Sequence, residues 1–176
     1  MMDVDEPDQA GQAAVTAAVC GLFCSACTIY IGTHEDPARL ERLAASFSTS
    51  VDRLQCDGCR SGRRLFYCDT CHMFACAAQR GYTFCSKCPD CPCPELEGFV
   101  AERPHRADIY RDLARIAEIG GEAWIAEASA RHACPKCGTL NSAYDLACRK
   151  CGHDPSSPYV EEHRARIMAQ MLERAD

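Results

Sequence analysis

Apolar side chains recur at helical spacing in several parts of the chain, and the first such part follows Asp36-Pro37. An aspartate caps a first helical turn well, and proline fits the first helical position. The apolar residues that follow fall on one face of a helix, at Leu40, Leu43, Ala44 and Phe47. The stretch DPARLERLAASFS therefore predicts a short amphipathic helix.

The helical period returns from Pro94 onward. We expect a short helix over 94–102 that Pro104 breaks, and then a helix that stops at Gly120-Gly121. A further helix, EAWIAEASARH, carries the only tryptophan, Trp124. The apolar stripes are Ile109, Leu113 and Ile116 before the glycine pair, and Val160, Ile167, Met168, Met171 and Leu172 in a closing amphipathic helix. These stripes predict packing on the chain's own core, with a partner surface as the alternative for the last helix.

Cysteine density divides the chain into parts. Residues 20–93 hold twelve of the sixteen cysteines, and from 50 to 93 we expect only short loops and turns, with a hairpin near RRLFYC. The predicted division is a disordered acidic lead-in at 1–19, a cysteine-rich metal-binding domain at 20–102, a helical connector at 103–132, a zinc ribbon at 133–153 and a C-terminal amphipathic helix at 154–176. The predicted fold class is small, metal-stabilised and mostly α plus irregular, with a β-hairpin in the ribbon.

Sixteen cysteines in 176 residues indicate that cross-linking chemistry, and not apolar burial alone, holds the fold. Disulfides need an oxidising compartment and therefore an export signal. The first residues are acidic, with Asp3, Asp5, Glu6 and Asp8, whereas a signal peptide has a basic start. No stretch approaches the ~20 apolar residues of a membrane span. We therefore expect a cytoplasmic protein with reduced thiols and no membrane partner.

The formal charge is −6, and thiolates around a metal make the protein more negative still. Phosphate backbones repel such a surface, so we expect no DNA binding. Residues 131–153 are a local exception, because Arg131, Lys136, Arg149 and Lys150 stand against Asp145 alone. This basic segment keeps RNA binding at the ribbon as a weak alternative.

The strongest motif is CPKCGTLNSAYDLACRKCG, whose cysteines follow the spacing CxxC-x10-CxxC at Cys134, Cys137, Cys148 and Cys151. Two residues between cysteines let both sulfurs face one ion, and the glycine after each pair, Gly138 or Gly152, can adopt positive φ. The ten residues between the pairs suffice for a hairpin. We interpret the motif as a structural zinc ribbon. Rubredoxin-like iron is the alternative, because four thiolates suit both metals.

The earlier cysteines form a crowded block. CDGCRSGRRLFYCDTC supplies a second four-thiol cage, although Cys76 lies close enough in sequence to replace one member. The cage cysteines are Cys56, Cys59, Cys68 and Cys71, and the remaining metal-ligand candidates are Cys20, Cys24, Cys27, Cys76, Cys85, Cys88, Cys91 and Cys93. These eight suffice for two more sites, but spacing alone does not pair them.

The opening stretch CGLFCSAC has the C-x3-C-x2-C spacing of radical S-adenosylmethionine enzymes. Ala26 stands where those enzymes usually carry an aromatic residue, and no alternation of strands and helices follows to build a partial barrel. An iron–sulfur cluster bound by Cys20, Cys24, Cys27 and the 85–93 group stays open, because CSKCPDC has the CxxCxxC core of bacterial cluster ligation.

No residue is assigned a catalytic role. A catalytic thiol needs a histidine and an acid partner, and the sequence singles out no such pair. His72 follows Cys71, while His132 and His153 flank the ribbon, and we expect all three at the surface and not among the ligands. Zinc with four thiolates also has no open position for a water or a substrate.

Several of these motifs occur together in a characteristic order. CGLFCSACTIYIG is followed by CDGC, CDTCHMFAC and CAAQRGYTFCSKCPDCPC, and later by EIGGEAWIAEASARHACPKCGTLNSAYDLACRKCG. In this order the chain resembles a prokaryotic cysteine-rich family known as domain of unknown function 3795, over about residues 19–153. The resemblance implies metal binding, zinc before other metals, and no established activity. The acidic lead-in and Cys91 depart from the family pattern, which makes Cys91 the weakest ligand candidate.

The sequence thus favours a cytosolic, non-enzymatic zinc-binding protein with two to four zinc sites. It is expected to act as a protein-interaction or accessory module whose partner is another protein. The alternative is an iron–sulfur redox or electron-transfer protein that uses the cysteines of residues 20–93. The two differ in composition, because only a cluster brings visible absorption and acid-labile sulfide.

Overall fold

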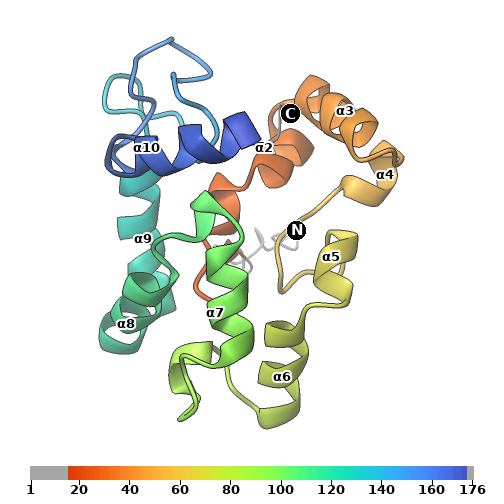
Figure 1. The fold of residues 1–176 in the computed structure, drawn as a ribbon, viewed down its shortest axis with the longest axis vertical. Helices are drawn as coiled ribbons and strands as arrows, with labels where there is room; N and C mark the ends of the chain where they lie inside the picture. The colour runs from red at the N-terminus through yellow and green to blue at the C-terminus, as the bar shows by residue number, and fades with distance from the viewer. Residues whose placement is uncertain (1–15, 174–176) are drawn as a thin grey trace, which may run out of the picture.

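Helices and their connecting loops make up residues 16–173, the part of the chain that this computed structural model describes (Figure 1). The helical segments are η1 (Cys24–Ala26), α2 (Thr28–His34), α3 (Pro37–Ser46), α4 (Val51–Leu54), α5 (Phe66–Asp69), α6 (His72–Arg80), η2 (Cys85–Lys87), α7 (Pro94–Ala101), η3 (Pro104–Arg106), α8 (Ile109–Ile119), α9 (Gly121–His132) and α10 (Pro158–Glu173). Within that range, β pairing is limited to two isolated antiparallel bridges, Ala17 with Phe23 and Ala133 with Leu140. The expected mostly α character is therefore confirmed. None of these helices is both long enough and apolar enough to cross a membrane.

The helix predicted after Asp36 is α3. The Asp36 side chain accepts a hydrogen bond from the backbone N–H of Arg39 at 3.0 Å, so the predicted cap is present. Leu40 and Ala44 are buried against α2 and α4. Phe47, which the pattern predicts on the same face, is 45% exposed, because it follows the last helical turn.

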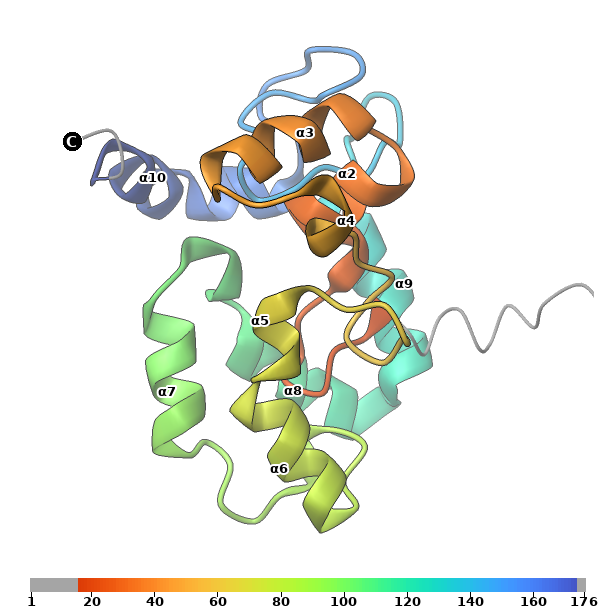
Figure 2. The same cartoon turned by 90° about the vertical axis from the view of Figure 1, so that its right-hand side faces the viewer.

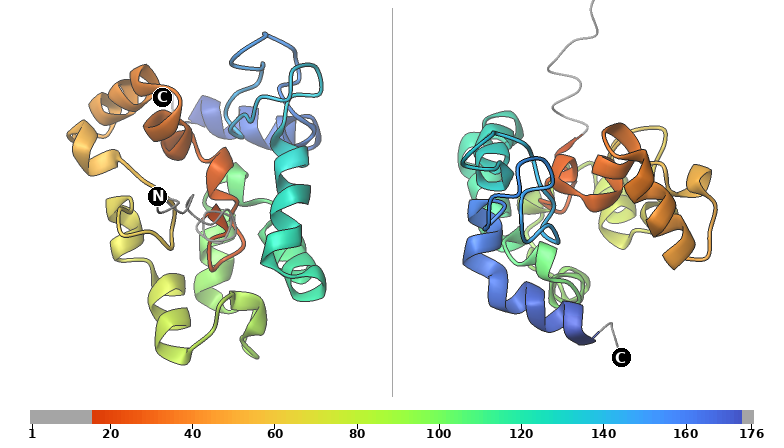
Figure 3. Two further views of the ribbon diagram at one scale, coloured as in Figure 1. Left: turned by 180° about the vertical axis from the view of Figure 1, so that it is seen from behind. Right: turned by 90° about the horizontal axis from the view of Figure 1, so that it is seen from above.

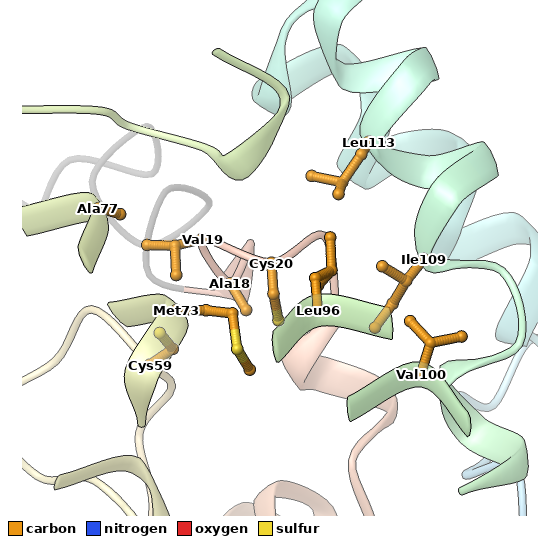
Figure 4. Packing of buried hydrophobic residues seen from close by; sticks show 10 residues of the cluster. All are labelled: Ala18, Val19, Cys20, Cys59, Met73, Ala77, Leu96, Val100, Ile109 and Leu113. Atoms are coloured by element: carbon orange, nitrogen blue, oxygen red, sulfur yellow. The ribbon is translucent and has the colours of Figure 1, made fainter. Parts of the chain in front are cut away.

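A looped segment, residues 17–23, passes between the helices and supplies the centre of the main core (Figure 4). Three helices pack on it through Met73 and Ala77 of α6, Leu96 and Val100 of α7, and Ile109 and Leu113 of α8. Ala18 and Val19 are buried in this core. The predicted disordered lead-in at 1–19 therefore ends too late, since its last residues are apolar and covered by helices. Residues 1–15 lie outside the described part of the chain.

The α8–α9 pair forms a second apolar centre. The stripe predicted before the glycine pair is buried, at Ile109, Leu113 and Ile116. Trp124 is 1% exposed, and its ring meets the edge of Phe23 at a centroid distance of 6.1 Å. Its indole N–H donates to Asp112 Oδ1 at 3.1 Å, and Arg131 Nη2 donates to the same oxygen at 2.6 Å. The buried carboxylate therefore has partners, as a buried polar group requires.

The closing helix α10 divides its predicted stripe into two halves. Val160 and Ile167 are buried near Tyr159, whose hydroxyl donates to the carbonyl of Pro104 at 2.8 Å. The C-terminal half of the stripe faces outward, with exposures of 44% at Met168, 42% at Met171 and 68% at Leu172. Packing on the chain's own core therefore holds for the first half only.

The prediction of loops and turns for residues 50–93 is wrong, because α4, α5, α6 and η2 lie there. The expected hairpin near RRLFYC is a helical turn, in which Cys68 N donates to the carbonyl of Leu65 at 2.7 Å. Leu65 and Phe66 pack beside the core of α3 and not across a strand pair. Helix α6 ends at Gly81 with φ 72°, a left-handed cap that glycine favours. The many cysteines of this region led us to expect loops in place of α6, although the glycine that ends the helix can be seen in the sequence.

Candidate metal centre

Two similar turns present the ribbon cysteines. In the first, Gly138 N donates to the carbonyl of Cys134, and Cys134 N donates to the carbonyl of Thr139, both at 2.9 Å. In the second, Gly152 N donates to the carbonyl of Cys148 at 2.9 Å, and Cys148 N donates to the carbonyl of His153 at 2.8 Å. The φ angles of Gly138 and Gly152 are 73° and 71°, so the predicted positive φ is confirmed at both.

The four ribbon sulfurs converge on one point. The Sγ atoms of Cys134 and Cys151 are 3.6 Å apart, as are those of Cys137 and Cys148, and all four lie within 4.8 Å of one another. A tetrahedral zinc with Zn–S bonds of about 2.3 Å requires sulfur–sulfur edges of about 3.8 Å. The donor set therefore fits one tetrahedral metal ion.

Backbone N–H groups point toward the ribbon sulfurs. Lys136 N donates to Cys134 Sγ at 3.4 Å. Burial raises the pKa of Cys148, but hydrogen bonds from the backbone of Cys151 and Lys150 and from neighbouring thiols outweigh it and bring the pKa to about 6. A hydrogen bond with the Thr139 side chain lowers the pKa of Cys137. These contacts favour the thiolate, the metal-binding form of cysteine, at Cys148 and Cys137, whereas, despite a backbone hydrogen bond, burial and the neighbouring thiols raise the pKa of Cys151 to about 11.

The hairpin predicted between the two cysteine pairs is wrong, because local side chains take up the backbone groups that a strand ladder would use. Asn141 Oδ1 accepts from Arg149 N at 3.0 Å, and Asp145 Oδ2 accepts from Ser142 N at 2.8 Å. Ser142 Oγ in turn accepts from Tyr144 N at 3.1 Å. Between the pairs, the chain therefore forms a loop, which hydrogen bonds between its own polar side chains and its backbone stabilise.

Asn141 is a residue that the sequence analysis missed. It is fully buried, and its amide N–H groups donate to the carbonyls of Thr139 at 2.8 Å and Ser156 at 3.1 Å. With its own backbone N–H it also donates to the carbonyl of His132 at 3.0 Å. Asn141 therefore joins the first turn, the end of α9 and the segment before α10. The sequence feature that could have indicated this role is the position of an asparagine between two CxxC pairs.

His132 was expected at the surface, but the structure buries it. Its ring stacks on Tyr159 at a centroid distance of 4.5 Å and lies 5.9 Å from the ring of Phe23. Burial lowers the pKa of His132 to about 3, which keeps the ring neutral at physiological pH. The ribbon is thus attached to a neutral, apolar part of the core.

The ribbon loop lies behind α3 in Figure 2 and to one side of α2 and α3 in Figure 3, and long side chains join these segments, which are far apart in the sequence. Arg39 of α3 makes two parallel hydrogen bonds to the carboxylate of Asp145, at 2.8 and 3.1 Å. Arg149 pairs with Glu35 at the end of α2. A paired guanidinium and carboxylate fix relative orientation as well as distance. The ribbon is therefore fastened to the cysteine-rich half of the chain.

The second predicted cage, formed by Cys56, Cys59, Cys68 and Cys71, is less closely gathered. In residues 16–173, the ribbon is the one all-cysteine group whose ligand atoms lie within 4.8 Å of one another. Burial, followed by the charges of Cys56, Cys59, Cys71 and Cys27, raises the pKa of Cys68 to about 12. These thiols are neighbours, and the cage itself stays a prediction.

The opening cysteines face this group more than they face residues 85–93. Cys20 lies in the main core with Cys59. Burial raises the pKa of Cys20, and the charges of Cys59, Cys71 and Cys85 raise it further. Burial likewise raises the pKa of Cys24, while a hydrogen bond from the backbone of Cys59 opposes this. Because Cys85 belongs to the 85–93 group, Cys20 lies near both cysteine groups.

The remaining five cysteines line one cavity of about 30 Å³, at Cys76, Cys85, Cys88, Cys91 and Cys93. His72 is exposed, as expected, and also lines the cavity. All sixteen cysteines of the chain are free thiols and none forms a disulfide.

Comparison with known proteins supports the expected family for the cysteine-rich half. Residues 16–98 match the family described as Protein of unknown function (DUF3795). The matched segment holds all twelve early cysteines and ends before α8, so the ribbon lies outside it. No curated protein and no solved structure matches the chain.

A second group with metal-ligand chemistry lies outside this DUF3795 segment, where Asp108, Glu162 and His163 bring their ligand atoms within 4.8 Å. Arg111 pairs with both carboxylates, and His163 Nε2 lies 2.9 Å from Asp108 Oδ1. Arg131 approaches Asp108 at 3.6 Å. Arginine already supplies the positive charge, so this group acts as an ion-pair network that fastens α10 to α8.

Proposed function

We propose that this protein is a cytosolic, non-enzymatic zinc-binding protein in which the ribbon cysteines hold one structural Zn²⁺. The observation that carries the proposal is the convergence of four sulfurs within 4.8 Å of one another, with two of the sulfur–sulfur distances at 3.6 Å. Iron in the same cage is the rival. Zinc is favoured, because divalent zinc binds a given site more tightly than divalent iron.

The role proposed for this zinc is structural. Four thiolates close the coordination shell and leave no position for a substrate. The ion joins two turns whose connecting loop carries Asn141 and Asp145, and Asp145 reaches across to Arg39. Zinc would therefore fix the surface that the ribbon shares with α3.

The proposed module acts through another protein. Met168, Met171 and Leu172 are spaced i, i+3 and i+4 along α10, and all three are exposed, which makes one apolar helix face. The RNA alternative is weaker, because two of the four ribbon cations are committed to carboxylates: Arg131 to Asp112 and Arg149 to Glu35.

Metal analysis of the purified protein tests the zinc proposal. We expect the double variant C134S/C137S to contain one zinc fewer than the wild type and to melt at a lower temperature. The control is K136A, an exposed non-ligand in the same turn, which should keep the full zinc content. Equal zinc content in the cysteine variant and the wild type would overturn the proposal.

Photo-crosslinking tests the partner proposal. A photoreactive residue at Met171 should give one recurring adduct with a different protein in the native host, and the same residue at Glu173, away from the apolar face, should not. Crosslinks from Met171 only to a second copy of the chain, or none, would contradict a protein partner at this face.

A further inference from the structure

The cavity lined by five cysteines lies among α6, the loop around η2 and the start of α7. Four of its cysteines come from the stretch CSKCPDCPC, and Cys76 comes from α6. Met73 and Ala77 hold α6 against the core, where Leu96 also lies (Figure 4). These three residues line the cavity together with Cys76. A cavity of about 30 Å³ holds more than one water-sized group.

The sulfurs around this cavity stand farther apart than those of the ribbon. In the ribbon, four sulfurs lie within 4.8 Å of one another, and in the cavity no three ligand atoms do so among the residues that the structure describes. One tetrahedral zinc requires edges of about 3.8 Å. The five thiols therefore surround a space wider than a single ion.

The residue types identify the chemical class of ligand. Iron–sulfur clusters are bound by cysteine thiolates, are larger than one ion, and take ligands from CxxCxxC segments such as Cys85, Cys88 and Cys91. We propose that this cavity binds an iron–sulfur cluster through Cys76, Cys85, Cys88 and Cys91. The site goes beyond the zinc function, since it shares no ligand with the ribbon.

Two contacts select Cys76 over Cys93 as the fourth ligand. Arg80 Nη1 donates to Cys88 Sγ at 3.1 Å, and Arg80 also hydrogen-bonds Cys76, so one cation serves both thiolates. Asp90 pairs with Arg80 at 2.8 Å and lies 3.9 Å from Cys88 Sγ. Cys93 instead hydrogen-bonds the Glu95 carboxylate at the start of α7. Cys93 is therefore the spare cysteine.

The test measures iron, acid-labile sulfide and zinc in protein expressed with added iron and purified anaerobically. We expect the wild type and C93S to contain equal iron and sulfide with visible absorption. We expect C76S and C88S to lose the iron, the sulfide and the absorption. The ribbon variant C137S should lose zinc and keep the cluster.

Thiol alkylation of the wild-type protein gives a readout that needs no variant to fold. With the cluster bound, Cys76, Cys85, Cys88 and Cys91 should be protected from an alkylating reagent, and Cys93 should react. Oxidative removal of the cluster should make all five reactive.

Three results would overturn the inference. Absence of labile sulfide from the wild type, after purification and after reconstitution with iron and sulfide, would remove the cluster, as would zinc alone in the cavity. A cluster retained by C76S and lost by C93S would refute the choice of fourth ligand. Zinc retained by C137S would instead contradict the ribbon proposal and leave the cluster in place.

Discussion

The ribbon and the cysteine block of residues 20–93 use the same residue in two different ways. In the ribbon, four sulfurs converge, and the loop between them buries small or polar side chains such as Asn141, Ser142 and Ala143. In the block, Cys20 and Cys59 are packed within an apolar core among Met73, Leu96 and Leu113. Ala143, with Tyr144 and Leu146 beside it, packs on α10, so the ribbon has some apolar burial too, and we expect a metal to contribute more to its stability than to that of the block.

Metal removal should separate the two regions most strongly. With a strong chelator, residues 133–157 should lose amide protection, because a structural zinc contributes on the order of 10 kcal/mol. Helices α8 and α9 should stay protected, since their apolar contacts do not involve the metal. Hydrogen exchange, followed segment by segment with and without chelator, checks this. Unchanged protection in the ribbon would break the comparison.

The next largest effect is expected at the apolar centre of α9. The change Trp124→Ala should cost roughly 3–5 kcal/mol, because it removes a fully buried ring that packs on Phe23. Denaturant unfolding in zinc-saturated buffer measures the loss, and Trp124→Phe, which keeps a ring, should cost less. If Trp124→Ala lowered the free energy of unfolding by less than about 1 kcal/mol, burial would not be the main stabilising term around α9, and the contrast with the ribbon would fail.

Asn141 tests how much of the ribbon rests on polar contacts. The change Asn141→Ala should cost about 1–3 kcal/mol, because it leaves buried backbone groups without partners. The zinc content should not change, since the ligands are untouched. Lys150→Ala, an exposed position in the second cysteine turn, serves as the control and should lie within about 0.5 kcal/mol of wild type. Loss of zinc from Asn141→Ala would show that the loop and the metal site are not separable.

The smallest effect is the coupling between the two regions. A double-mutant cycle on Arg39 and Asp145 should give roughly 1–2 kcal/mol, because the pair is bidentate and both side chains are mostly buried, at 11% and 15% exposure. The exposed pair Arg63 and Asp57 provides a reference, at about 0.2–1 kcal/mol. A coupling no larger than the reference would mean that the ribbon and α3 are stabilised independently.

Features encoded within a few neighbouring residues could be predicted from the sequence. The cap of α3, the stripe of α8 and the glycine turns at Gly138 and Gly152 each depend on one short stretch. The convergence of the four ribbon sulfurs belongs to the same class, because each CxxC pair positions its own sulfurs and one loop joins the pairs.

Features that join distant segments could not be predicted. Cys76 meets the 85–93 cysteines only because α6 packs on the core, and its helical period was obscured by cysteines expected in loops. The burial of His132 depends on Phe23 and Tyr159, which lie far away on either side in the sequence. The ribbon hairpin failed for a local reason, since Asn141 and Asp145 compete for the backbone groups of a strand pair.

X-ray absorption at the zinc edge of the purified protein tests the ribbon centre most directly. We expect four sulfur ligands at about 2.3 Å and no nitrogen or oxygen ligand, with this signal reduced in C134S/C137S by the share of one zinc ion. Zinc bound through nitrogen or oxygen, or an unchanged spectrum in that variant, would contradict this expectation.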